Sequence, residues 1–229
     1  MSRTFEIHKD YYGDDYDLYK KDSVTIEEGL TVIVGCNGMG KTTLIREISE
    51  VLEDESDIIV IKYNNLTDGN LNAMERHMLR GDLNFTATAY CSSEGERIMM
   101  SLYDVAQACG KAVRSIGDKT KEIWLMLDAV DSGFSIDNII DLKEDLLDLF
   151  LSDMQGTGIP TYVLVTANSY EMASGENCLA AYDLEYRKFS GYDEYRDFIL
   201  ETREIKNHRN DKPKKKRNSN RWTEFKRVK

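Results

Sequence analysis

Four segments of the chain are continuous runs of apolar, largely β-branched residues, a pattern typical of strands buried on both faces of a parallel sheet. They are LTVIVG at 30–35, DIIVIKY at 57–63, IWLMLD at 123–128 and TYVLVT at 161–166. Amphipathic patterns with helical spacing lie between them, at 41–52, 94–116 and 136–154. Strands that alternate with helices in this way predict an α/β fold built on a largely parallel sheet.

Both ends of this region carry weaker patterns. The segments FEIH, YDLYKK and SVTI in the first thirty residues are short and alternating, which predicts an N-terminal antiparallel β-layer against the parallel sheet. Near the C-terminus, LAAYDLEYRKF predicts one further strand pair, and SGYDEYRDFILETREI follows it with helical spacing.

Charge is distributed unevenly along the chain. Eleven of its 30 Lys and Arg but only two of its 41 acidic residues lie in 205–229, so this segment carries +9 and the remainder −20. The run KPKKKR repels itself and buries nothing, so we expect one folded domain over 1–204 and a flexible basic tail over 205–229. Phosphate polymers are natural partners of such a tail; the alternatives are that it only keeps the protein soluble or that it packs against the acidic body of its own or a neighbouring subunit.

Several classes of protein are disfavoured by composition. No apolar run approaches the roughly 18 to 20 residues that cross a bilayer, and the N-terminus lacks a secretory pattern. The four cysteines are far apart without a CxxC pair, and the three histidines lack metal-ligand spacing, so we expect reduced structural cysteines and no transition-metal site. The expected location is cytoplasmic, without a membrane partner.

Residues 35–42 spell GCNGMGKT, which matches the phosphate-binding pattern G-x-x-x-x-G-K-[ST] and lies between a predicted strand and a predicted helix. The glycines let backbone N–H groups converge on phosphate at the positive end of the helix. Lys41 is expected to bridge the β- and γ-phosphates, and the Thr42 hydroxyl to bind Mg²⁺. The predicted nucleotide-binding residues are Gly35, Asn37, Gly38, Gly40, Lys41, Thr42 and Thr43.

The spelling G-x-N-G-x-G-K-T-T resembles that of ATP-binding-cassette (ABC) ATPases, whose further motifs follow in the family's order. CSSEGER at 91–97 is similar to the signature LSGGQR, with Glu94 where the first glycine usually stands. IWLMLD ends in Asp128, similar to the Walker B aspartate, and TAN at 166–168 stands where the family has its switch histidine. The stretch similar to the D-loop consists of Asp131, Ser132 and Gly133.

This resemblance covers about residues 1 to 200 and implies a P-loop NTPase sandwich of the ABC-ATPase type. It implies ATP and Mg²⁺ as cofactors, with the metal held by Thr42 and Asp128. It also implies a homodimer across the nucleotide, in which Ser93, Gly95 and Glu96 act in trans. By local pattern alone, Ser93 is an N-cap of the 94–116 helix with Glu96 completing a capping box; the two interpretations are compatible.

Two positions depart from the family. Ala129 follows Asp128 where the family has a catalytic glutamate, and Asn168 replaces the switch histidine. Loss of a general base usually costs about 10² to 10⁴ in rate, whereas nucleotide binding can survive it. The catalytic residue is therefore unknown. Two explanations stay open: a naturally slow, switch-like ATPase, or an introduced substitution that traps the ATP state.

The interval between Lys41 and Ser93 disfavours transport, because a transporter ATPase normally carries a substantial helical subdomain there. It contains one predicted helix around 71–79, the element Tyr63-Asn64-Asn65 in place of a Q-loop glutamine, and no heptad run. The chain thus resembles a recombination or chromosome-maintenance (SMC/RecF-like) head without its coiled-coil arm.

The leading functional hypothesis is an ATP-dependent dimer that acts on nucleic acid through 205–229. The competing hypothesis is a dimeric switch that recruits a partner protein, such as a nuclease or toxin. Four tyrosines precede the phosphate loop: Tyr11, Tyr12, Tyr16 and Tyr19. One of them is a candidate for stacking on adenine, but we favour the interpretation that all four line the β-layer.

Overall fold

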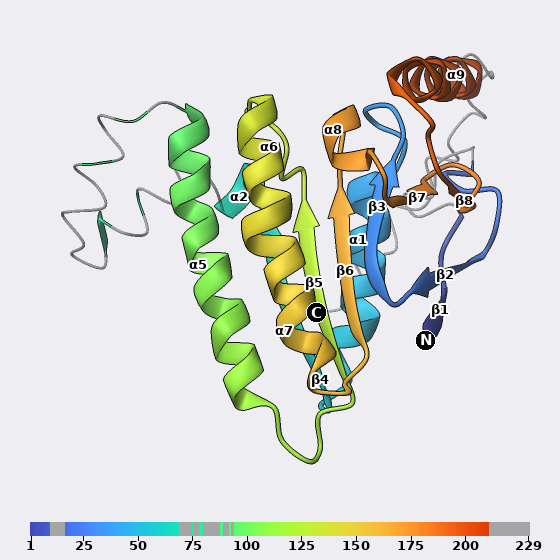
Figure 1. Ribbon diagram of the computed structural model, residues 1–229. Coiled ribbons are helices and arrows are strands. Elements are labelled where there is room, and N and C mark those ends of the chain that lie inside the picture. Colours follow the sequence, from blue (N-terminus) through green and yellow to red (C-terminus); the bar gives the residue numbers. More distant parts are fainter. Residues whose placement is uncertain are drawn as a thin grey trace, which may run out of the picture.

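The centre of the protein is a six-stranded sheet in the order β4-β5-β6-β3-β7-β8 (Figure 1). The structure is a computed structural model that describes residues 1–9, 17–68, 75, 78–79, 88, 92 and 94–210. The strands are β3 (Gly29–Val34), β4 (Ile58–Asn64), β5 (Glu122–Asp128), β6 (Thr161–Thr166), β7 (Asn177–Ala180) and β8 (Tyr186–Arg187). All pairs are parallel except β7 with β8, which confirms the predicted α/β fold and the C-terminal strand pair.

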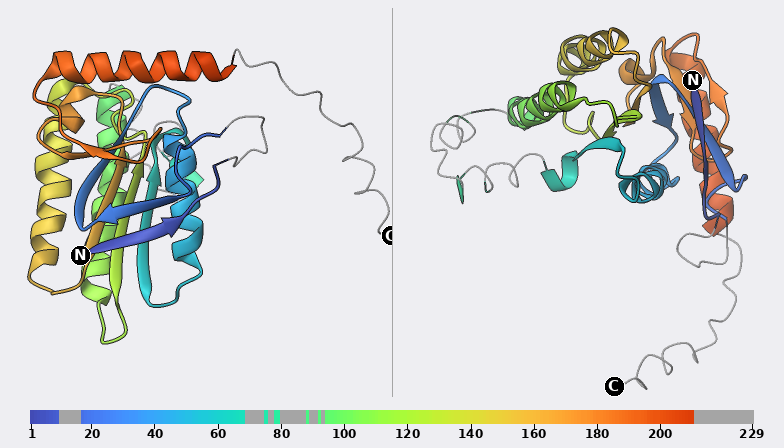
Figure 2. Two further views of the ribbon diagram at one scale, coloured as in Figure 1. Left: turned by 90° about the vertical axis from the view of Figure 1, so that its right-hand side faces the viewer. Right: turned by 90° about the horizontal axis from the view of Figure 1, so that it is seen from below.

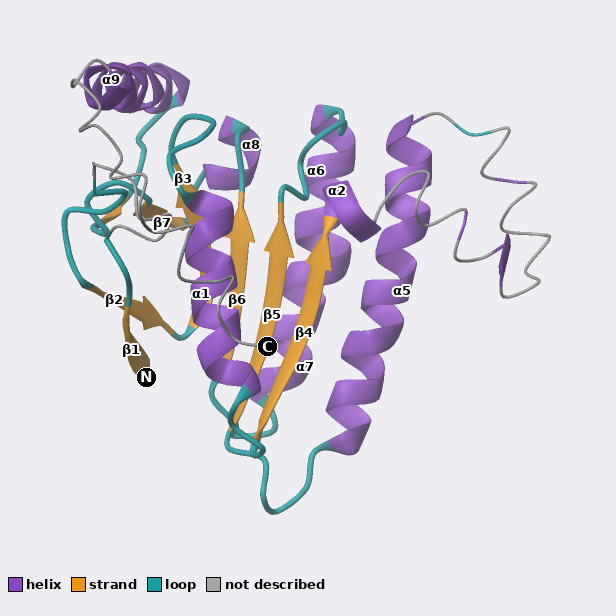
Figure 3. Ribbon diagram, turned by 180° about the vertical axis from the view of Figure 1, so that it is seen from behind, coloured by secondary structure: helices purple, strands orange, loops and turns teal. Residues whose placement is uncertain are grey.

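Helices cover both faces of the sheet (Figure 3). One face packs against α5 (Glu94–Ser115) and a continuous helical segment made of α6 (Ile136–Leu142), the π-helical η1 (Lys143–Asp148) and α7 (Leu149–Gln155). The other face packs against α1 (Lys41–Glu53). Two short helices, α2 (Asn65–Asp68) and α8 (Tyr170–Ala173), follow β4 and β6. Each face therefore has its own apolar core.

The predicted β-layer is a separate antiparallel pair, β1 (Ser2–Glu6) and β2 (Ser23–Glu27), on the α1 side of the sheet (Figure 2). Phe5 packs edge to face against Trp124 of the central sheet, so the two sheets share one core. The prediction of a strand at YDLYKK was wrong for its described part, 17–21. Leu18 and Tyr19 are both buried, whereas a strand with one face in water buries alternate residues.

Helix α9 (Tyr192–Asn210) crosses the carboxyl edge of the sheet (Figure 1). Tyr195 and Phe198 anchor its first half in the core. The helix continues past the expected boundary after residue 204 because Lys206 and Arg209 donate hydrogen bonds to the backbone carbonyls of Asn37 and Leu18. Order thus extends to Asn210, further than the sequence predicted. The rest of the basic segment, 211–229, lies outside the described residues.

Other predictions concern single residues or fall on undescribed positions. Cys36, Cys109 and Cys178 are free and buried, as expected of structural thiols, while Cys91 lies outside the described residues. The helix predicted at 71–79 falls largely outside them as well. Within the part of the chain that the structure describes, no helix is both long and apolar enough to cross a membrane.

We expect Thr202→Val to lower the free energy of unfolding by about 1 to 3 kcal/mol, because it leaves a buried N–H without an acceptor. The Thr202 hydroxyl accepts a hydrogen bond of 3.1 Å from the Cys36 backbone N–H and donates one to the Ile199 carbonyl. Urea denaturation measures the change. Thr202→Ser keeps the hydroxyl, lacks only the methyl group and is the matched control; a loss in Thr202→Val no larger than that in Thr202→Ser would show that the hydrogen bond contributes little.

Candidate nucleotide site

The register of the parallel strands brings the predicted site residues to one edge. Asn64 pairs with Asp128 across β4 and β5, and Thr166 pairs with Ile33 across β6 and β3. The phosphate loop begins directly after β3, so its glycines lie at the same carboxyl edge as Asp128. This is where parallel α/β sheets bind ligands, because neighbouring strands deliver their C-terminal residues together.

The phosphate loop depends on glycine at two positions. Gly38 and Gly40 have φ angles of 78° and 96°, which side chains rarely adopt. A Cβ atom at Gly40 would also lie 3.1 Å from the Tyr19 ring. Helix α1 begins immediately afterwards at Lys41, so its first N–H groups lack acceptors within the helix and face the loop region as anion donors.

Tyr19 packs against the phosphate loop at Gly40. Its hydroxyl donates a 2.9 Å hydrogen bond to the Gly40 carbonyl, and its side chain is fully buried. Among the four tyrosines considered for adenine, the other three lie outside the described residues. Tyr19 lines the core beneath the β-layer, which is the role that we favoured.

Lys41 lies inside the loop. Its Nζ donates to the Gly35 carbonyl at 2.6 Å and to Asn168 Oδ1 at 2.9 Å. Burial lowers the pKa of the Lys41 ammonium, and the nearby carboxylates of Asp131 and Asp128 act in the opposite direction. The residue at the switch position therefore contacts the loop lysine directly, which places Asn168 beside the expected phosphate position.

Asp128 is the centre of a second polar cluster. It is only 3% exposed, and its Oδ1 accepts hydrogen bonds from the hydroxyls of Thr42 at 3.1 Å and Thr166 at 2.6 Å. Its Oδ2 accepts one of 2.8 Å from Asn64 Nδ2. A cavity of about 220 Å³ opens beside Thr42, Asn64 and Asp128.

This donor set fits magnesium. Mg²⁺ prefers hydroxyl, carboxylate and water oxygens and usually keeps several waters, for which the cavity offers room. Thr42 and Asp128 would hold the ion, which when bound neutralises charge on the β- and γ-phosphates. Sequence reasoning did not assign Asn64 and Thr166 to this cluster. The available signals were the place of Asn64 at the Q-loop position and of Thr166 at the end of a buried strand.

The segment that follows β5 is hydrogen-bonded to the end of β6 and to the segment after it. Ala129 has a φ of 54°, and its N–H donates to Thr166 Oγ1 at 2.7 Å. Asp131 is buried, and its Oδ2 accepts hydrogen bonds of 2.7 Å from the backbone N–H groups of both Asn168 and Ser169. Asp131 therefore ties the segment after β5 to the segment after β6 within one subunit. Of the other D-loop positions, Ser132 accepts a hydrogen bond from Asn65 through its carbonyl.

The signature-like residues are remote from this cluster. Gly95 and Glu96 lie in the first turn of α5, which packs beside β4, three places from β3 in the sheet order (Figure 3). Ser93 lies outside the described residues. The structure thus gathers the phosphate loop, Asp128, Asp131 and Asn168 at one place but leaves Gly95 and Glu96 apart from them.

The family model for ABC transporters matches residues 19–141, which is more than half of the chain. The chain therefore belongs to this family and contains an ABC-type P-loop ATPase domain, which binds ATP. No curated protein matches the chain.

We expect Asp128→Asn to remove the effect of Mg²⁺ on ATP affinity. An amide binds a hard cation less well than a carboxylate, while the phosphate loop stays intact. Titrating a fluorescent ATP analogue with Mg²⁺ and with EDTA should give a clear difference for the natural protein and less than about a twofold difference for the variant. Asp141→Asn, on an exposed position of α6, is the control. A full Mg²⁺ effect in Asp128→Asn would place the metal elsewhere.

Proposed function

We propose that this protein is a slow, switch-like ATPase that forms a homodimer around ATP–Mg²⁺ and acts on nucleic acid, as heads of the SMC/RecF-like type do. The single observation that carries the proposal is the contrast within the site. Lys41 and Asp128, which would bind phosphate and metal, are buried and hydrogen-bonded within the site, whereas Ala129 stands at the position of the hydrolytic base.

Slow turnover follows from that contrast. A missing base or water-positioning group costs about 10² to 10⁴ in rate, and ATP binding does not depend on it. The buried carboxylate of Asp131 is occupied at Oδ2 by two backbone N–H groups, so it serves to position the chain rather than to replace a glutamate at 129. A long-lived ATP state is what a switch requires.

Dimer formation is supported by the distance between α5 and the phosphate loop. By family resemblance, the signature-like Ser93 and Gly95 contact the terminal phosphate, but Gly95 begins a helix that packs at the far edge of the sheet from its own loop. A second subunit would bring its α5 to this loop. ATP then stabilises the dimer by mass action, because it binds groups from both chains.

Action on nucleic acid is supported by charge. The 205–229 segment carries +9 beside a body of −20, and its first residues extend α9 near the phosphate loop. We expect labelled DNA to bind at low salt in the presence of ATP–Mg²⁺ and to dissociate as salt rises. Deleting 211–229 should abolish this binding while leaving α9 in place. No binding of DNA or RNA at low salt would favour the alternative, a switch that recruits a partner protein.

The oligomeric state tests the switch itself. Light scattering coupled to size exclusion should show a doubling of mass with ATP–Mg²⁺ and a monomer with ADP or without nucleotide. Lys41→Ala, which cannot hold the triphosphate, is the matched control and should remain monomeric in every condition. A monomer of the natural protein under saturating ATP–Mg²⁺ would contradict the dimer.

A further inference from the structure

One face of helix α9 contacts successive residues of the phosphate loop. Thr202, Lys206 and Arg209 follow each other at spacings of four and three residues, which puts them on one face of the helix. Thr202 accepts a hydrogen bond from the Cys36 N–H at 3.1 Å. Lys206 donates to the Asn37 carbonyl at 2.8 Å, and Arg209 donates to the Met39 sulfur at 3.6 Å. One face of α9 thus follows the loop from its start to its tip.

Lys206 lies beside Gly38 of the loop. Its Nζ lies 3.1 Å from the place that a Cβ on Gly38 would occupy. The structure shows no ion pair for Lys206 among the described residues; its hydrogen-bond acceptor is the neutral Asn37 carbonyl. Its positive charge is close enough to act on Lys41, where it lowers the pKa of that ammonium. Two cations therefore converge on one loop, an arrangement that repels itself until an anion lies between or beside them.

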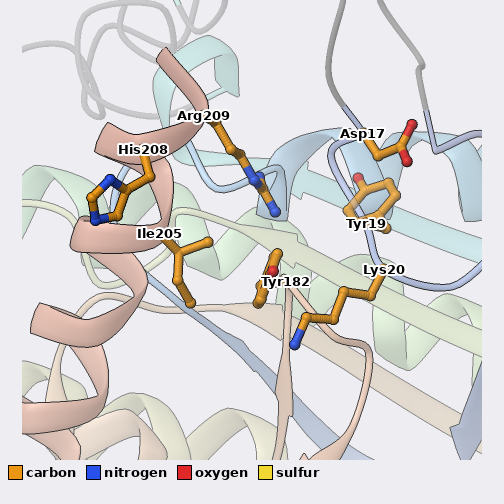
Figure 4. A pocket seen from close by; sticks show the side chains of 7 residues that line it. All are labelled: Asp17, Tyr19, Lys20, Tyr182, Ile205, His208 and Arg209. Carbon is orange, nitrogen blue, oxygen red and sulfur yellow. The ribbon is translucent and has the colours of Figure 1, made fainter. Parts of the chain in front are cut away.

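The same end of α9 lines a cavity of about 480 Å³ beside the loop (Figure 4). His208 and Arg209 come from α9, Lys20 and Tyr19 from the segment before β2, and Tyr182 from the turn after β7. Its charged lining residues are the cations Lys20 and Arg209 and the carboxylate Asp17, so α9 extends a net positive surface beyond the loop itself. This surface suits a polyanionic ligand that reaches past the loop glycines.

We propose that Lys206 is a second cation of the nucleotide site, supplied by α9 of the same subunit, which binds the triphosphate of ATP together with Lys41. The inference rests on the proposed function only in requiring that the loop holds ATP. Lys206 exchanges a neutral acceptor, the Asn37 carbonyl, for a negatively charged phosphate oxygen, so its hydrogen bond gains the attraction of an ion pair. The flexible four-carbon stem of lysine permits this change without moving α9.

The test compares the affinities for ATP, ADP and AMP, measured by displacement of a fluorescent ATP analogue. Lys206→Met keeps the length and apolar stem of the side chain and removes its charge. We expect it to weaken ATP binding about fivefold, ADP binding less, and AMP binding by less than twofold, because the lost attraction scales with the number of phosphate charges. Lys206→Arg should restore ATP affinity to within about twofold. Arg203→Ala, which removes one charge from an exposed position of the same helix, should leave all three affinities unchanged.

The outcomes separate the hypotheses. If the natural protein binds no ATP, the proposed function fails. If the natural protein binds ATP and Lys206→Met binds it equally well, or loses ATP and AMP affinity by the same factor, Lys206 has no role as a phosphate ligand. The ratio of ATP to AMP affinity is internal to each variant, so a partial loss of folded protein does not change it.

Discussion

Lys41→Ala is expected to weaken ATP binding by at least about 100-fold. The Lys41 ammonium is buried inside the phosphate loop, where it is held by the Gly35 carbonyl and Asn168 Oδ1. Removing one partner of a buried charged contact costs about 2 to 5 kcal/mol, and 100-fold corresponds to about 2.7 kcal/mol. The loss is large because the Lys41 ammonium is buried, where solvent and salt screen its attraction to phosphate only weakly.

Isothermal titration calorimetry with ATP–Mg²⁺ measures this effect. Lys121→Ala is the matched control, since it removes one positive charge at the opposite edge of the sheet, where Lys121 is paired with Asp57. We expect its ATP affinity to match that of the natural protein. Unchanged affinity in Lys41→Ala would show that ATP is bound somewhere other than the phosphate loop.

Ala129→Glu is expected to raise the rate of ATP hydrolysis at least tenfold. The substitution places a carboxylate directly after Asp128, where the family has its general base, and such a group contributes about 10² to 10⁴ in rate. Position 129 tolerates the change, because the left-handed φ of 54° penalises any Cβ and alanine already carries that cost. The hydrogen bond from the residue 129 N–H to Thr166 uses only backbone and is kept.

Steady-state phosphate release under saturating ATP–Mg²⁺ measures the gain. Ala129→Gln has the same length but cannot accept a proton, and it should stay within about twofold of the natural protein. An equal gain in both variants would indicate an effect of side-chain packing. No gain in either would mean that hydrolysis lacks a further part, for which Asn168 at the switch position is the first candidate.

Local patterns in the sequence were sufficient for much of the site. The four apolar runs are the parallel strands β3 to β6, and the phosphate loop lies between β3 and α1, as its spelling requires. Asp128 ends β5 beside the hydroxyl of Thr42, the other residue predicted for the metal. These features are predictable because hydrophobic periodicity and glycine spacing act within a few residues of the chain.

Tertiary structure decided the surroundings of that site. Asn64 and Thr166 join Asp128 only because the sheet order brings the ends of β4, β5 and β6 together, and Asp131 turns inward toward the segment after β6. Lys206 reaches the loop over a separation of 169 residues. In sequence it is one more cation near a basic tail, and it acquires its place from Tyr195 and Phe198, which fix α9 on the core.

The sequence by itself determined the class of fold, the phosphate loop and the missing glutamate, since each is written in neighbouring residues. Only the tertiary structure decided that a C-terminal helix lies on the phosphate loop and that YDLYKK is not a strand. Both depend on where distant apolar side chains pack, and burial in a shared core is a property of the whole chain rather than of any segment.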